Sequence, residues 1–386
     1  MNEASIHVVF AEEDTLFRLM EVALLRKLTP AGEKSLCYFF GDDYGSASKA
    51  LMLMADELGL PRSLETTVCT NAEQLDHRLP TADFLVLESS KLNAEKIKLC
   101  LPRTRLVQQF GHAYRNIDIA FAQKAGLRVA NLNRLSSQSS CDHITALILA
   151  LARRLMPAHQ AVVSRADFNL PSHFSNEPVR NKFNWGEIRA LKLLGKSTIG
   201  FVGLGENSGL VARRASQLGL RVLYFKRAPL NAEEEAAFGG ISYAPLDELL
   251  AQSDFVSLHL PYNAETEKFA DASFFSKMKR GAYLINSARG GLVDEEALYR
   301  SLKAGQIAGA ALDVYRYEPI PPDCPLLELD NIIWTPHMSG GEPEYLIEEV
   351  RDVLTNIARV LRRELPENLI QESFSERFSE RRAATL

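Results

Sequence analysis

The sequence predicts an α/β protein of two domains, each built on a mainly parallel sheet. At 386 residues the chain exceeds what one ordinary hydrophobic core holds, which favours two domains. Short apolar runs rich in β-branched residues alternate with helical patterns almost throughout, as is typical of parallel sheets covered by helices. A nearly all-apolar helical stretch, 142–157, separates two such series and ends at Pro157. Because a helix that is apolar on all sides is buried, we expect it at the junction of the two domains.

The expected strands of the first series are short apolar runs with polar or turn residues on either side. They cover residues 6–10, 35–40, 65–69, 84–89, 105–110 and 128–132. Between the first of them lie two amphipathic helical patterns, 14–28 and 46–60. Helices between successive strands are what a parallel sheet requires, because each strand must be reached by a crossover.

The second series repeats the alternation after a polar, loop-rich segment at 158–196. Its expected strands cover residues 198–205, 221–225, 255–260, 281–288, 308–314 and 331–336. A helical pattern follows at 343–365. The last residues, 366–386, are mostly polar and charged, so we expect a flexible or surface segment there.

Composition and charge exclude several classes of function. A net charge of −5 with interspersed signs is unlike the basic face that nucleic-acid binding needs. The longest apolar run, 144–152, is far shorter than the roughly 18 residues of a membrane span, and the first residues lack an export signal. Five scattered cysteines suit a reducing cytoplasm better than a disulfide framework. Since no CxxC, HExxH or His/Cys cluster occurs, we expect no metal site.

A glycine-rich turn follows the first strand of the second series and opens a helical pattern. Gly203 permits the tight turn, and Gly205 lets backbone approach a pyrophosphate at a helix N-terminus. Ser208 stands where a Gly or Ala usually lets helix and strand pack closely, so we expect its extra oxygen to displace the turn. We expect Glu206 to face solvent, because an anion beside a phosphate is repelled. The predicted Rossmann-type dinucleotide site comprises Gly203, Leu204, Gly205, Glu206, Asn207 and Ser208. The alternative is a glycine turn that serves packing alone.

Two cations end the next strand, where a carboxylate usually holds the ribose of NAD. Lys226 reverses that charge, and Arg227 offers a fork that suits phosphate. The pair therefore predicts that NADP(H) is preferred, with NAD(H) possible. The alternative is two solvated cations that do not discriminate between the cofactors.

Four long segments carry a family resemblance. They are residues 105–134, 255–269, 278–298 and 308–340. In this order they closely resemble the D-isomer-specific 2-hydroxyacid dehydrogenases, which include glyoxylate/hydroxypyruvate reductases. The resemblance implies a flavodoxin-like substrate domain, 1–140 with 337–386, into which a Rossmann-type dinucleotide-binding domain, 141–336, is inserted. It also implies a homodimer.

The resemblance implies a catalytic trio, Arg289, Glu318 and His337. Reducing a 2-keto acid takes a hydride to the carbonyl carbon and a proton to its oxygen. An imidazole such as that of His337 suits proton donation because it titrates near neutrality. Glu318 would fix the tautomer and favour the protonated ring. Arg289 would bind the substrate carboxylate and orient the carbonyl.

Further positions match the family's cofactor site. Asp313 matches the residue that faces the nicotinamide carboxamide, although it can also simply cap a strand end. The others are expected to line the cofactor through backbone shape or small size: Pro261, Ser287 and Ala288.

The loop that presents backbone N–H groups to the substrate carboxylate in the family departs from its usual pattern here. Gly111, His112 and Ala113 are the expected substrate-binding residues. Ala113 replaces a frequent glycine, so a positive φ there would carry a steric cost. His112 either lines the substrate site or points away while its N–H binds. We interpret Arg115 as a solvated or paired residue rather than a substrate clamp.

The segment before the apolar helix is also unusual. Arg134 and nearby serines leave the nature of the substrate's tail open; an acidic or hydroxylated tail is compatible with them. Asp142 and His143 align with a Glu-His pair of the family, and we interpret His143 as structural because His337 already fills the catalytic role.

The sequence therefore predicts an NAD(P)-dependent oxidoreductase that interconverts a small 2-keto acid and its D-2-hydroxy acid, in the reducing direction with NADPH. The departures at Ala113, Glu206, Asn207 and Ser208 keep one alternative open, a dinucleotide-binding partner protein resembling corepressors of this fold. A further alternative is oxidation of another small anion, such as formate or phosphite.

Overall fold

The computed structural model describes residues 5–42, 44–112, 114–164 and 184–370. The chain divides into two compact units. The first unit is 1–136 with 342–386, and the second unit is 137–341. The sequence placed these divisions at 140/141 and 336/337. Each unit contains one parallel sheet, which confirms the predicted fold class.

The sheet of the first unit has five parallel strands in the order β2-β1-β3-β4-β5. They are β1 (Ile6–Phe10), β2 (Leu64–Val68), β3 (Phe84–Leu87), β4 (Leu106–Gln109) and β5 (Val129–Ala130). This is the flavodoxin-like order, in which the chain reverses direction across the sheet between β1 and β3. Ligands of such sheets bind outside the carboxyl ends of the strands at that point.

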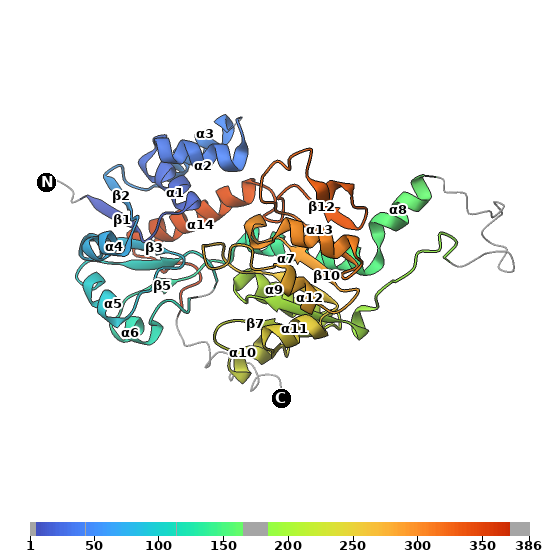
Figure 1. Cartoon of the computed structure of the whole chain (residues 1–386). Coiled ribbons are helices and arrows are strands. Elements are labelled where there is room, and N and C mark those ends of the chain that lie inside the picture. The colour runs from blue at the N-terminus through green and yellow to red at the C-terminus, as the bar shows by residue number, and fades with distance from the viewer. Residues whose placement is uncertain (1–4, 43, 113, 165–183, 371–386) are drawn as a thin grey trace, which may run out of the picture. The chain divides into compact units, whose positions relative to one another are not determined.

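Helices cover both faces of this sheet (Figure 1). One face packs against α1 (Thr15–Leu25), α2 (Pro30–Phe40), α3 (Gly45–Glu57) and α14 (Glu344–Leu361). The other packs against α4 (Ala72–Arg78), α5 (Ala94–Cys100) and α6 (Ile119–Lys124). Alternate residues of β1 serve the two cores, Val8 and Phe10 on one face and Val9 on the other, because side chains alternate along a strand.

The predicted strand at 35–40 is wrong, because this run is the second half of α2. The signals that start the helix precede the run. The Thr29 hydroxyl accepts a hydrogen bond from the Gly32 N–H, and Pro30 occupies the first turn. Of the apolar run itself Leu36 is buried, whereas Tyr38 is exposed, so the pattern has a helical period.

Residues beyond α14 return to the first sheet. Leu369 forms an antiparallel bridge with Ala130, and the Ile370 N–H donates to the Val129 carbonyl at 2.8 Å. The start of the predicted flexible segment, 366–370, is therefore held against β5, where it covers an otherwise open sheet edge. Its remainder, 371–386, lies outside the described residues.

The sheet of the second unit has seven parallel strands in the order β12-β11-β10-β9-β6-β7-β8. They are β6 (Thr198–Val202), β7 (Arg221–Phe225), β8 (Ser242–Tyr243), β9 (Phe255–Leu258), β10 (Tyr283–Asn286), β11 (Gly309–Leu312) and β12 (Ile332–Trp334). Counted from β6, this is the Rossmann order 3-2-1-4-5-6 with one strand added. The two-residue strand β8 was not predicted, since so short a run carries no pattern.

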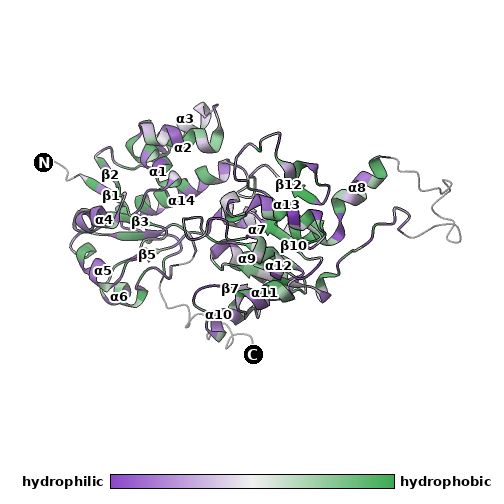
Figure 2. Cartoon of the chain, in the orientation of Figure 1, coloured by the Kyte–Doolittle hydropathy of each residue, from purple (hydrophilic) through white to green (hydrophobic). Residues whose placement is uncertain are grey.

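Helices also cover both faces of this second sheet. One core forms with α7 (Leu135–Arg153) and α9 (Glu206–Gln217), the other with α11 (Leu246–Gln252), α12 (Ala272–Lys277) and α13 (Glu295–Lys303). The short helix α10 (Ala232–Ala237) follows β7. Figure 2 shows hydrophobic residues along the central strands, while α13 alternates between hydrophobic and hydrophilic.

The apolar helix breaks before the predicted position. α7 ends at Arg153, Arg154 adopts a left-handed conformation with φ +50°, and α8 (Leu155–Val163) begins with Pro157 as its third residue. Proline is tolerated in a first turn, so Pro157 starts a helix instead of ending one. No single helix of the described ranges is long and apolar enough to cross a membrane. Together α7 and α8 reach that length and composition, but the pair is bent by 62°.

Candidate active site

The glycine turn lies at the carboxyl end of β6. Gly203 has φ +93°, and a Cβ there would lie 2.5 Å from the His259 carbonyl oxygen, so no other residue fits without rearrangement. No atom lies within 4 Å of a Cβ placed at Gly205, the N-cap of the 12-residue helix α9. A tight turn, open space and a helix N-terminus together fit the pyrophosphate of a dinucleotide.

Ser208 closes this turn with a hydrogen bond. Its side chain is buried, and its hydroxyl accepts a hydrogen bond from the Gly205 N–H at 2.7 Å. That amide is therefore satisfied within the protein and does not point at a ligand. Leu204 packs against the core, Asn207 is exposed, and Glu206 is half-buried, less open to solvent than expected.

Lys226 and Arg227 follow β7, the strand beside β6. The Gly203 N–H donates to the Phe225 carbonyl at 2.9 Å, so the turn and the strand end with the two cations are directly connected. Lys226 is half-buried and Arg227 is exposed. The structure thus places both cations next to the turn, at the position where the fold holds the ribose of a dinucleotide.

His337 and Glu318 form a hydrogen-bonded pair. The Nδ1 atom of His337 lies 2.7 Å from one carboxylate oxygen of Glu318, and the other oxygen accepts from the Tyr315 N–H at 3.0 Å. Both side chains are about one-third exposed. Because Nδ1 faces the carboxylate, Nε2 is left to meet a substrate. His337 itself has φ +52°, a left-handed conformation that costs a non-glycine residue energy and often occurs at functional sites.

The loop that contains His337 surrounds the carboxylate of Asp313. The Asp313 side chain is fully buried. This carboxylate accepts from the Thr335 hydroxyl at 2.6 Å and from the N–H groups of Met338 and Ser339, each at 3.0 Å. Burial opposes its charge, but these hydrogen bonds and one from His143 outweigh burial and lower the pKa of Asp313 to about 2. The engaged carboxylate supports the capping role that the sequence left open for Asp313.

His143 supports this network from α7, as its structural interpretation implies. Its Nε2 atom lies 3.1 Å from the Thr335 hydroxyl and 3.4 Å from Asp313. Sequence reasoning identified His143 but not its partners, because Thr335 is 192 positions away. Asp142 forms an ion pair with Arg214 on α9.

Arg289 lies in the turn after β10. The Asn286 side chain shapes that turn by accepting from the Ala288 N–H at 3.1 Å and donating to the Arg289 carbonyl at 2.9 Å. A Cβ at Gly290 would come within 1.9 Å of the Tyr315 backbone, so the turn packs directly on the loop that leads to Glu318. The exposed guanidinium of Arg289 donates to the Ala288 carbonyl at 2.6 Å. The structure therefore joins Glu318 and His337 but does not bring Arg289 into contact with them.

The remaining predicted cofactor residues lie at the ends of β9 and β10. Ser287 and Ala288 are half-buried, and Pro261 is exposed. Sequence reasoning missed His259, two residues before Pro261, although its signal is in the same motif. Its Nε2 atom lies 2.8 Å from the Ser257 hydroxyl, and burial lowers the pKa of His259 to about 4. The His259 imidazole is therefore neutral near pH 7, and the His259 carbonyl lies against Gly203 of the turn.

The predicted substrate loop follows β4 in the first unit. Gly111 has φ +131°, and its carbonyl accepts from the Leu132 N–H at 3.1 Å. His112 is exposed: its Nδ1 atom lies 3.0 Å from the Asn133 side chain, and its carbonyl accepts from the Asn131 side chain. Ala113 lies outside the described residues. Arg115 is exposed.

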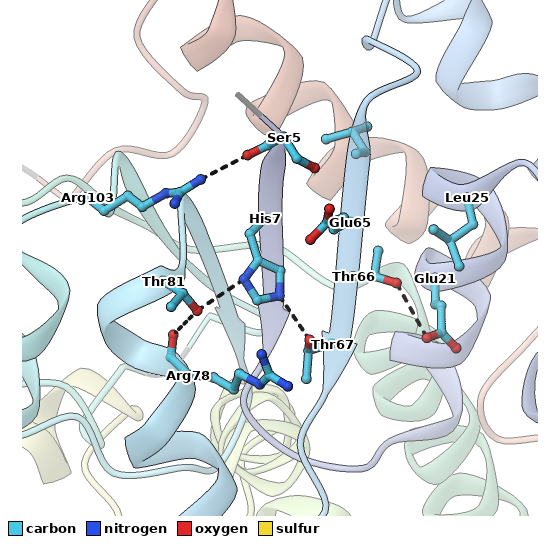
Figure 3. Close-up of a pocket in the computed structure, with 11 residues that line it drawn as sticks. Ser5, His7, Glu21, Leu25, Glu65, Thr66, Thr67, Arg78, Thr81 and Arg103 are labelled. Atoms are coloured by element: carbon cyan, nitrogen blue, oxygen red, sulfur yellow. Dashed lines mark hydrogen bonds between the residues drawn. The ribbon is translucent and has the colours of Figure 1, made fainter. Parts of the chain in front are cut away.

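A pocket of about 740 Å³ lies elsewhere in the first unit, beside β1 and β2 (Figure 3). At its centre both ring nitrogens of His7 meet threonine hydroxyls, Thr81 at 3.2 Å and Thr67 at 2.9 Å. Arg103 on its rim is committed to Asp83 and the Ser5 carbonyl. None of the predicted catalytic or cofactor residues lines this pocket, so we assign the chemistry to the strand ends described above.

Metal-ligating side chains do not gather anywhere in the described ranges. No group of three or more His, Cys, Asp or Glu there could hold a metal ion. All five cysteines are free thiols: Cys37, Cys69, Cys100, Cys141 and Cys324.

Comparisons with known proteins identify the family. Residues 145–339 match the family model described as D-isomer specific 2-hydroxyacid dehydrogenase, NAD binding domain. A glyoxylate reductase of Korarchaeum cryptofilum is 36% identical over 298 residues, which cover 76% of this chain and 84% of that protein. A D-3-phosphoglycerate dehydrogenase of Archaeoglobus fulgidus is 36% identical over 284 residues, which cover 73% of this chain but only 50% of that protein.

Solved structures share the fold. The PH0520 protein of Pyrococcus horikoshii superimposes with a TM-score of 0.56 over 95% of both chains, at 24% identity. The TT0316 protein of Thermus thermophilus gives a TM-score of 0.50 at 26% identity and covers 95% of this chain and all of that one.

Proposed function

Because this chain belongs to the D-isomer-specific 2-hydroxyacid dehydrogenases, we propose that it reduces a small 2-keto acid to its D-2-hydroxy acid, with NADPH preferred over NADH. The confirmed family supplies a nicotinamide dinucleotide as cofactor. The observation that carries the proposal is the pair of His337 and Glu318, 2.7 Å apart, at the carboxyl edge of a Rossmann sheet. An acid held by a carboxylate at this edge is what carbonyl reduction needs.

His337 is the proposed proton donor. When bound, a nicotinamide dinucleotide would supply a hydride, whose electron pair would form the new C–H bond while the carbonyl π electrons moved to oxygen. The Nε2–H of His337 then gives its proton to that oxygen, and Glu318 stabilises the ring through Nδ1. The strained backbone at His337, held by the loop around Asp313, keeps the imidazole fixed before substrate arrives.

Arg289 is the proposed carboxylate ligand. Its guanidinium is exposed and held to the protein by the Ala288 carbonyl, so its other N–H groups remain available for a carboxylate. Its turn is fixed by Asn286 and Gly290, which supports a positioned cation near the paired acid. On the first unit, Gly111, His112 and Ala113 remain the predicted partners of the substrate carboxylate.

A turnover assay tests the proposal. Purified protein is incubated with NADPH or NADH and each of glyoxylate, hydroxypyruvate, pyruvate and phenylpyruvate, and loss of reduced cofactor is followed. We expect turnover of at least one acid, with the D-2-hydroxy acid as product. Cofactor binding without turnover of any acid would replace the proposal with a non-catalytic dinucleotide-binding protein. Oxidation of formate or phosphite in place of keto-acid reduction would also overturn it.

Lys226 and Arg227 support the NADPH preference, because a 2′-phosphate gains two cationic partners beside the turn. Nicotinamide fluorescence titrations with NADPH and NADH test this for the wild type and for Lys226→Asp. We expect NADPH to bind at least tenfold more tightly, about 1.4 kcal/mol, and the variant to lose the difference. Equal affinities in the wild type would contradict the assignment.

We also propose a homodimer. The apolar side chains of Leu155, Met156, Val162 and Val163 on α8 are each more than half exposed. An exposed apolar patch of this kind favours association with another surface. Light scattering should give twice the monomer mass, and Val162→Lys with Val163→Lys should lower it.

The five free thiols support the expected cytoplasmic location.

A further inference from the structure

Three separate turns of the second unit carry the proposed catalytic residues. Arg289 follows β10, Glu318 lies in the loop after β11, and His337 lies in the loop after β12. Because each turn ends a different strand, a common contact is needed to fix the three side chains relative to one another. Tyr315, a residue that the proposed mechanism does not use, contacts all three turns.

The backbone of Tyr315 meets the turns of Arg289 and Glu318. A Cβ at Gly290 would lie 1.9 Å from the Tyr315 carbonyl carbon, so the residue after Arg289 packs directly on this backbone. The Tyr315 N–H donates to one carboxylate oxygen of Glu318 at 3.0 Å, and the other oxygen lies 2.7 Å from Nδ1 of His337. The backbone of Tyr315 therefore fixes Glu318 relative to the turn that carries Arg289.

The side chain of Tyr315 reaches the third turn. Its hydroxyl donates to the Thr335 carbonyl at 2.6 Å, and the Leu312 carbonyl lies 2.9 Å from the same hydroxyl oxygen. Thr335 precedes His337 by two residues, and its carbonyl also accepts from the His337 N–H at 3.1 Å. The Tyr315 ring packs 5.8 Å from that of Trp334, and burial raises the pKa of Tyr315 to about 12. The phenol is therefore a hydrogen-bond donor throughout the neutral pH range.

Loss of the Tyr315 hydroxyl would leave neither carbonyl without a donor. The Thr335 carbonyl keeps the His337 N–H, and the Leu312 carbonyl keeps the Thr335 N–H at 3.0 Å. Loss of a hydrogen bond is most costly where it leaves a buried acceptor without a partner, so the fold does not depend on this hydroxyl. Its contact instead orders the loop that leads to His337.

We propose that Tyr315 is a positioning residue, whose hydroxyl holds the loop of His337 in place relative to Glu318 and Arg289. This inference rests on the proposed function. The left-handed backbone of His337, with φ +52°, persists only where neighbouring contacts hold it, and the Tyr315 hydroxyl supplies one of them. Without this contact the imidazole would meet the substrate carbonyl in the correct geometry less often, which lowers kcat and leaves binding unchanged.

The variant Tyr315→Phe removes the hydroxyl and keeps the ring, the N–H and the packing against Gly290. Rates are measured with full-length protein, NADPH and each of glyoxylate, hydroxypyruvate, pyruvate and phenylpyruvate. We expect kcat to fall about tenfold for every acid that the wild type reduces, while KM changes less than about twofold, because only the chemical step depends on the imidazole geometry. Fluorescence titration of NADPH should give the wild-type affinity and verify that the variant is folded.

Two comparisons separate positioning from a general structural effect. Tyr299→Phe removes a phenol hydroxyl on α13 whose hydrogen-bond partners, Lys303 and Glu328, lie outside the three turns, and it should leave kcat unchanged. In a His337→Gln background Tyr315→Phe should lower the residual kcat no further, because a positioning residue acts only through the group that it positions.

The outcomes separate this inference from the proposed function. Failure of the wild type to reduce any of the acids overturns the proposed function, and the role of Tyr315 with it. Turnover by the wild type with an unchanged kcat in Tyr315→Phe keeps the proposed function and overturns the positioning role alone. A higher KM at unchanged kcat, an equal loss in Tyr299→Phe, or a further tenfold loss in the His337→Gln background also overturns it.

Discussion

Each unit contains one fully buried carboxylate near the carboxyl edge of its sheet, and the two are held very differently. Asp313 in the second unit accepts hydrogen bonds from Thr335 and two backbone N–H groups. Glu349 in the first unit has one backbone donor and a guanidinium 3.5 Å away, and its Oε2 atom has no hydrogen-bond partner. A fully satisfied carboxylate fixes the loop of His337, where chemistry requires a single geometry. The Arg134–Glu349 pair satisfies its carboxylate less completely and fixes its surroundings less firmly.

Replacing the proton donor His337 should have the largest effect. In His337→Gln the proton donor is lost, so kcat should fall about 10³-fold for every acid. Cofactor binding should persist, because the glycine turn is untouched. Steady-state rates with a fluorescence titration of NADPH check both parts. An unchanged kcat in the variant would contradict the role of His337 as proton donor.

Removing the ion pair of Arg134 and Glu349 should have the next largest effect. Arg134→Met leaves Glu349 buried without a counter-ion, which should cost about 3 kcal/mol of unfolding free energy. Arg134→Met with Glu349→Met should recover most of that loss. Urea unfolding, followed by near-UV circular dichroism, measures both. A double variant as unstable as the single one would show that the cation stabilises the first unit by other contacts.

Lowering the pH should protonate Asp313 and reduce the free energy of unfolding. The pKa of Asp313 is about 2 in the folded protein and near 3.9 when unfolded, so its stabilisation is present above pH 4 and lost as the pH falls toward 2. The loss should reach about 2 kcal/mol. Asp313→Asn should show a flatter decline over this window in unfolding experiments between pH 5 and 2. The same slope in wild type and variant would contradict the charge assigned to Asp313.

The smallest effect should be a loss of unfolding free energy between pH 6.5 and 5.5, caused by His259. Its pKa of about 4 lies below the usual 6.5, so the unfolded chain binds a proton first and stability falls as the pH drops below 6.5. Between pH 6.5 and 5.5 the loss should be about 1 kcal/mol. His259→Gln should remove that slope, whereas His77→Gln, which alters an exposed histidine on α4, should keep it.

Some strands and site residues of this protein could be predicted from the sequence, and others could not. Strands such as 198–202 and 255–258 were found because a buried strand is a continuous apolar run. The pairing of Glu318 with His337 was predicted because both residues lie in segments that resemble family motifs. Arg134 was noted in the sequence, but its contact with Glu349 was not predicted, because the two residues are far apart in the chain. The strand predicted at 35–40 failed because the helix signals at Thr29 and Pro30 lie outside the run.

The return of the chain to the first sheet has a consequence for synthesis. Strands β1 to β5 leave the ribosome first, but α14 and Ile370, which complete their core and cover β5, come only after the whole second unit. At 5–20 residues per second, about 200 intervening residues impose a wait of roughly 10–40 s. Until then apolar side chains that pack against α14, such as those of α1, remain open to water. The first sheet therefore waits longer than the second sheet for the last element of its core.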